Sequence, residues 1–120
     1  MPEVYVNAKL QHGAKEIDAK LLLNSGGVGA ELVIPQSLAK KLELKPWGRA
    51  EVSFGGRKLG GKTASVKVTI KNQRTGEERV SILETIVLPD KIIDVPLLGV
   101  VAQEKLRITP NVPTGEVLFV

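Results

Sequence analysis

Alternation of apolar and polar residues is the feature of this sequence that most restricts its fold. Every second residue of the segment 4–10 is apolar, which is the period of a half-buried β-strand. A turn at residues 11–13 leads into a second alternating run. We therefore expect a β-hairpin over residues 3–23.

Similar runs farther along the chain predict two more hairpins. Residues 50–54 and 64–70 alternate on either side of a glycine-rich centre, a pattern typical of a long hairpin with a glycine-rich tip. The next hairpin is expected to turn at residues 72–76, and its return strand ends before Pro89. A short apolar strand over residues 31–34 completes this part of the sheet.

Two segments have the spacing of short helices. Pro35 fits the first turn of a helix, and residues 37–42 continue it. The apolar segment 96–106 is expected to enter a second short helix, and residues 117–120 form a last strand. The sequence predicts an all-β fold class, mostly β with two short helices, as one domain over residues 1–120.

Composition argues against several classes of function. The 120 residues contain no cysteine and a single histidine, His12, so we expect no metal site and no cofactor. The net charge of +4 is scattered and aromatic residues make up only 3%, which argues against nucleic-acid binding. No stretch has the length of a membrane span and no apolar signal core is present, so a cytoplasmic protein without membrane contact is expected.

The most informative local motif is LLLNSGGVGAELVIP, residues 21–35. An apolar strand runs directly into a turn rich in glycine. One interpretation is a phosphate-binding loop, but Leu32 stands where a third glycine belongs and no lysine follows. A second is a tight turn with a purely structural role, in which Asn24 and Ser25 cap the backbone.

A third interpretation comes from a resemblance to the active-site signature of retropepsin-like aspartic proteases. That signature is a hydrophobic pair followed by Asp, then Thr or Ser, then Gly and usually Ala. Ser25 and Gly26 match it, Gly27 replaces the usual alanine, and Asn24 replaces the aspartate. The catalytic position and its neighbours would therefore be Asn24, Ser25 and Gly26.

The resemblance extends over nearly the whole chain. The glycine-rich hairpin over residues 49–62 lies where the family places its flap, and residues 96–99 resemble the segment that packs behind the active-site turn. Strands at both termini resemble those by which two short chains share a sheet. The chain is most similar to a prokaryotic branch of the family, which implies a closed β-barrel of the acid-protease type, one half-site per chain and a homodimer.

The implied reaction is peptide-bond hydrolysis by two carboxylates that share a proton and activate one water. A chain with one such turn must dimerise to supply the second carboxylate. Asn24 has nearly the same size as an aspartate, so we expect fold and dimer to persist. Its amide cannot take a proton from water, and the chain is therefore predicted to be inactive.

The resemblance also implies a substrate-binding cleft for an extended peptide or protein segment. Gly27 would let the backbone approach the substrate closely. The flap would contribute Phe54, Gly55, Gly56 and Leu59, which close over the peptide and exclude water.

Several questions stay open at this point. Asn24 is either an engineered isosteric change or a natural divergence, and deamidation of Asn24 to Asp is a third, weaker alternative. A non-catalytic module that clamps peptides or proteins in the same cleft is the main alternative function. Asp18, Asp90 and Asp94 are interpreted as solvated or capping residues, and Trp47 as a core residue or an anchor for the flap base.

Overall fold

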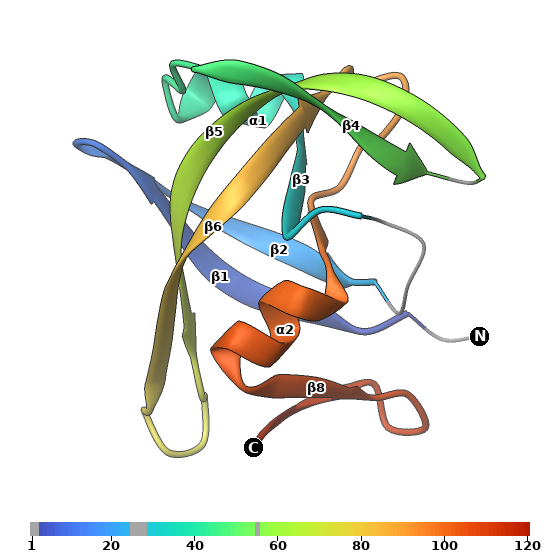
Figure 1. Cartoon of the computed structure of the whole chain (residues 1–120). Helices are drawn as coiled ribbons and strands as arrows, with labels where there is room; N and C mark the ends of the chain where they lie inside the picture. Colours follow the sequence, from blue (N-terminus) through green and yellow to red (C-terminus); the bar gives the residue numbers. More distant parts are fainter. Residues whose placement is uncertain (1–2, 25–28, 55) are drawn as a thin grey trace.

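The computed structural model describes residues 3–24, 29–54 and 56–120 and is mostly β (Figure 1). Its described part contains two short helices, as the sequence predicts. The elements are β1 (Tyr5–His12), β2 (Lys15–Leu23), β3 (Leu32–Pro35), α1 (Gln36–Lys41), β4 (Gly48–Phe54), β5 (Arg57–Lys71), β6 (Glu78–Leu88), β7 (Leu97–Leu98), α2 (Val100–Leu106), β8 (Ile108–Asn111) and β9 (Glu116–Phe119).

The strands form one large sheet and one small one. The large sheet has seven strands in the order β1-β2-β7-β3-β6-β5-β4, and β1 also pairs with β5. The pairings therefore lead from β1 through β2, β7, β3, β6 and β5 back to β1. In Figure 1 the long strands β5 and β6 curve from α1 down to their hairpin turn, and α2 lies in front of β1 and β2.

The predicted alternation explains how the strands pack. On β5, Val66 and Val68 are fully buried while Ser65 and Lys67 are exposed. Two of the strands that pair with β5, β1 and β6, also bury alternate residues in the same core. Leu10 of β1 and Leu83 of β6 are fully buried. Burial on one face of each strand is the main stabilising term for such a sheet.

A second cluster of buried residues lies beside this core, where β3 and β7 meet the hairpin of β4 and β5. Its buried members include Val33 of β3, Val52 of β4 and Leu97 of β7, and Leu59 of β5 packs partly against them. The strands that flank the turn are thus in one apolar cluster with the hairpin predicted to form the flap.

Three sequence-based expectations need correction. Pro35 is the last residue of β3 and the N-cap of α1 rather than part of the first helical turn, because its backbone pairs with Leu88. A strand that the pattern did not indicate, β8, pairs with β9. Trp47 is not a core residue: its side chain is 71% exposed.

The C-terminal strands form the small sheet, which contains only β8 and β9 among the described residues. Two-stranded sheets are marginally stable unless another element supports them. Ile108 at the start of β8 is buried in the main core, and Val117 and Phe119 of β9 pack partly against it. The far face of β9 leaves Leu118 exposed.

Candidate functional site

The glycine turn begins where β2 leaves the sheet. Leu22 and Leu23 pair in parallel with Leu97 and Leu98 of β7, and the Asn24 N–H then donates a hydrogen bond to the Leu98 carbonyl at 3.0 Å. Asn24 is half-buried. Main-chain pairing therefore fixes the direction in which the chain enters the turn.

The same short strand also receives the chain after the turn. Leu98 pairs with Leu32 of β3 in the antiparallel sense, so β7 lies between the two strands that the turn connects. A strand held on both sides has little freedom to shift, which makes it a rigid base for the turn.

Gln103 of α2 ties the helix to the start of the turn. Its side chain is 5% exposed, and its amide nitrogen donates to the Asn24 carbonyl and the Leu98 carbonyl, both at 2.9 Å. Sequence reasoning missed this residue. The available signal was a polar side chain beside Ala102 on the buried face of a very short helix, because a buried amide must find partners.

Gly99 lets the chain pass closely behind the segment that follows the turn. Its N–H donates to the Glu31 carbonyl at 2.9 Å. A Cβ atom at this position would lie 2.2 Å from the Ala30 carbonyl oxygen, far inside van der Waals contact. Only glycine fits here without movement of the backbone.

The Glu31 carboxylate fastens this segment to two other elements. One oxygen accepts the Glu84 N–H of β6 at 2.8 Å, and the other forms an ion pair with the Lys105 ammonium of α2. The Glu31 side chain is only 17% exposed. Its carboxylate therefore has a structural role at the end of the turn.

No other acid takes the place of Asn24 in the described part of the chain. Asp18, Asp90 and Asp94 are all exposed. One Asp90 oxygen accepts the Ser37 N–H at 2.9 Å, and this hydrogen bond holds the pKa of the Asp90 carboxyl below its ordinary value. The capping interpretation of Asp90 is thus confirmed, since α1 has no side-chain cap of its own. Residues 3–24, 29–54 and 56–120 also contain no cluster of His, Cys, Asp and Glu that could hold a metal ion.

The predicted flap is a regular hairpin of β4 and β5. Val52 pairs with Leu59 and Phe54 with Arg57, which leaves a two-residue tip. Gly56 in that tip has φ +77°, a conformation that favours glycine. Val52 is buried and Leu59 half-buried, so both face the cluster that contains β3 and β7.

A small cavity joins the flap to the segment after the turn. Its volume is about 110 Å³, and its lining includes Gly29, Ala30 and Glu31 together with Ala50 and Glu51 of β4. The hairpin base and the chain leaving the turn therefore share one hollow.

The structure does not describe every residue of the candidate site. Asn24, Gly56 and Leu59 are placed as given above, and the backbone of Phe54 ends β4. The predictions for Ser25, Gly26, Gly27 and Gly55 fall outside the described residues. The Phe54 side chain also lies outside the described part.

Comparisons with known proteins assign the chain to no family: its sequence matches no protein-family model and no curated protein. None of the helices in the described ranges is long and apolar enough to cross a membrane.

Proposed function

We propose that the chain is one half of a homodimeric, retropepsin-like aspartic endopeptidase whose catalytic position holds Asn24, which leaves it inactive. One observation carries this proposal: the strand before the turn, the strand after it and β7 form a rigid support for Asn24, locked by Gln103 and Gly99. A turn with a merely connecting role needs no such support.

The reaction requires two acids at contact distance. One carboxylate takes a proton from the attacking water while the other gives a proton to the substrate carbonyl oxygen. An amide at position 24 keeps the size and loses the proton chemistry. Loss of an acid–base group lowers the rate by roughly 10²- to 10⁴-fold, and a homodimer with Asn24 lacks both.

The C-terminal sheet offers a binding surface for a second copy of the chain. A groove of about 370 Å³ is lined by Tyr5 to Asn7 of β1 on one side and by residues 116–119 of β9 on the other. Among the described residues, β9 pairs with β8 alone, so its other edge can accept a strand. A β9 strand from a second copy would pair there across a twofold axis, which makes the interface self-complementary.

The hairpin of β4 and β5 supplies the cover of the cleft. Its inner face carries Leu59, and Gly56 at its tip has a φ of +77°. An extended peptide between this hairpin and the turn would present its own N–H and C=O groups to the backbone. A closed hairpin would also remove water from the reacting bond.

The alternative function is a non-catalytic peptide- or protein-binding module that uses the same cleft. Asn24 itself favours it, because binding does not require an acid at this position. The two functions differ in what restoring an aspartate does. A protease gains activity, and a binding module does not.

The test is the Asn24→Asp variant, assayed with a mixed library of unstructured peptides from acidic to neutral pH. We expect cleavage by this variant and none by the unaltered chain, with inhibition by a peptide mimic that carries a central hydroxyl group. Gln36→Glu is the matched control, because it makes the same amide-to-carboxylate change at an exposed residue at the start of α1, outside the turn and the groove. Asn24→Asp protein that is folded, dimeric and inert, but binds peptides, would overturn the protease in favour of the binding module.

A further inference from the structure

Arg79 of β6 is a buried cation outside the candidate catalytic turn. Its side chain is 9% exposed, yet the residue lies on a strand whose neighbours Glu78 and Val80 are exposed. Burial of a guanidinium is unfavourable unless its donors are matched. The acceptors of its hydrogen bonds therefore indicate which parts of the chain Arg79 connects.

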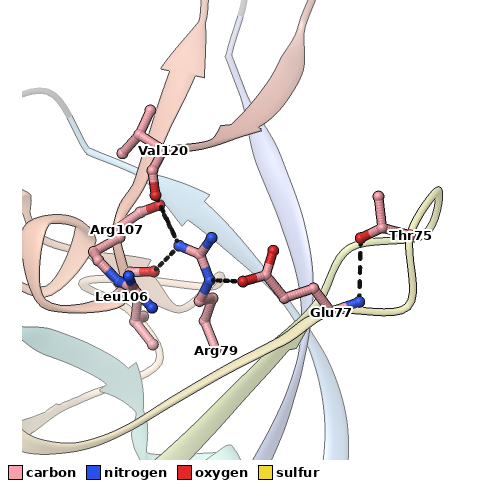
Figure 2. A network of polar contacts seen from close by, with 6 residues as sticks. All are labelled: Thr75, Glu77, Arg79, Leu106, Arg107 and Val120. Atoms are coloured by element: carbon pink, nitrogen blue, oxygen red, sulfur yellow. Dashed lines mark hydrogen bonds and ion pairs between the residues drawn. The ribbon is translucent and has the colours of Figure 1, made fainter.

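Figure 2 shows that the Arg79 guanidinium gathers three backbone carbonyls from the C-terminal part of the chain. Its Nη1 donates to the carbonyls of Leu106, Arg107 and Val120 at 3.3, 2.9 and 3.2 Å. The first two lie at the end of α2, where Arg107 adopts left-handed angles and terminates the helix. The third follows β9.

Two further contacts orient the guanidinium. Its Nε donates to a Glu77 carboxylate oxygen at 2.9 Å, and Glu77 is itself held by a hydrogen bond from its N–H to the Thr75 hydroxyl at 3.2 Å. The Phe119 ring of β9 lies with its centroid 5.1 Å from the guanidinium carbon, within range of a cation–π interaction. One side chain thus connects β6, α2 and β9.

The small sheet depends on this connection. β8 and β9 pair with each other, and the Val120 N–H closes the hairpin on the Arg107 carbonyl at 2.9 Å. Those bonds hold the hairpin together but attach β9 to nothing in the large sheet. Arg79 supplies the polar attachment of β9 to the body, beside the apolar packing of Phe119.

We propose that Arg79 is a positioning residue for self-association: it holds β9 in the orientation in which its free edge can pair with β9 of a second copy. The proposal rests on the homodimer proposed above and adds the residue that controls it. A lysine cannot replace Arg79 fully, because its single ammonium nitrogen cannot take the places of both Nε, which binds Glu77, and Nη1, which binds the carbonyls.

The experiment compares Arg79→Met, Arg79→Lys and the unaltered chain by sedimentation and by amide hydrogen exchange. Arg79→Met keeps an apolar stem and removes the charge. We expect its dimer dissociation constant to rise by about tenfold or more, as the loss of hydrogen bonds to a charged group implies, with a smaller rise for Arg79→Lys. Exchange should speed up in residues 108–120 and stay slow in the paired parts of β5 and β6.

Arg49→Met serves as the control, since Arg49 is exposed on β4 and should leave both measurements unchanged. An unaltered chain that dimerises as tightly as Arg79→Met would overturn the role of Arg79 and leave the proposed function standing. Faster exchange throughout β5 and β6 as well would overturn it too, because Arg79 would then support the whole fold. An unaltered chain that stays monomeric at all concentrations would overturn the homodimer, and the positioning role with it.

Discussion

The candidate catalytic turn and the C-terminal hairpin are held in opposite ways. Around Asn24 most of the support is main chain on both sides of β7, with a close backbone crossing at Gly99, and one buried side chain, Gln103, adds to it. At β9 the polar support is one side chain, Arg79. The support around Asn24 is part of the core. We expect the contacts of Arg79 with the C-terminal hairpin to be removable without unfolding that core. We therefore expect that mutations can separate the shape of the site from the assembly of the dimer.

The largest effect is expected for Gly99→Ala. The new methyl group would collide with the Ala30 carbonyl oxygen, so the backbone of the turn or of β7 must move. Overpacking against backbone should cost about 3 kcal/mol of stability, a large share of what a small domain has. Urea unfolding measures it.

Gly29→Ala is the matched control for that experiment. Among the described residues, a Cβ at Gly29 would meet nothing within 4 Å, although Gly29 is the direct neighbour of Ala30. Equal stability losses in the two variants would show that the close contact between Gly99 and the Ala30 carbonyl is not what limits substitution. The claim that a backbone crossing supports the turn would then fail.

A smaller effect is expected for Gln103→Leu. The substitution replaces the polar amide by an apolar side chain of similar size and removes the Gln103 donor from the Asn24 and Leu98 carbonyls, at a cost of about 1–3 kcal/mol. Dimer affinity should change little, because the helix face that holds Gln103 is not the β9 edge. Urea unfolding and sedimentation of the same samples measure both quantities, with the exposed Gln36→Leu as control.

If Gln103→Leu weakened the dimer as strongly as Arg79→Met, the support of the turn and the support of the C-terminal hairpin would not be separable. Site and assembly would then be one cooperative unit. If Gln103→Leu lowered only the stability, and changed the peptidase rate when combined with Asn24→Asp, the separation of site shape from dimer assembly would be supported.

Much of the fold follows from the sequence because alternation records which face of a strand is buried. The runs on β1 and β2 placed both strands within a few residues of their observed bounds, but β5 begins at Arg57, seven residues before the alternation that predicted it. β8 was missed because Ile108 to Asn111 contains a proline and too few residues to show a period. Trp47 was misjudged because hydrophobicity alone does not reveal a side chain left outside the sheet.

The candidate site was predictable where it is contiguous and unpredictable where it is not. Residues 21–35 carry the motif in one stretch, so Asn24 could be identified from the sequence. Gln103 and Arg79 act on carbonyls that are 79 and up to 41 positions away in the chain. No local sequence pattern identifies such partners. Every residue has a backbone carbonyl, so the sequence does not show which carbonyl will accept a hydrogen bond from a distant side chain.

The smallest predicted effect is a pH dependence of the C-terminal hairpin. The hydrogen bond from Arg79 holds the pKa of the Glu77 carboxyl below its ordinary value. A carboxyl with a lowered pKa contributes its stabilisation above its ordinary pKa, and loses it as the pH falls through the lowered pKa of the folded protein. Protection factors in residues 116–120 should therefore fall at acidic pH before those of β2 and β3.

The Glu77→Gln variant provides the control, since its side chain has no charge to lose. Its protection factors in β9 should be lower at neutral pH and should change less on acidification. Parallel losses in β9 and β2 for the unaltered chain would mean that Glu77 and Arg79 do not act locally.

The most direct test of one half-site per chain is a mixing experiment. Asn24→Asp protein is combined with the unaltered chain at fixed total concentration, equilibrated, and assayed for peptide cleavage. If two turns build each active site, only dimers with two aspartates work at full rate, and activity should fall as the square of the Asp-bearing fraction, to about one quarter in an equal mixture. A decrease in simple proportion to that fraction would show that each chain acts alone and would contradict the account.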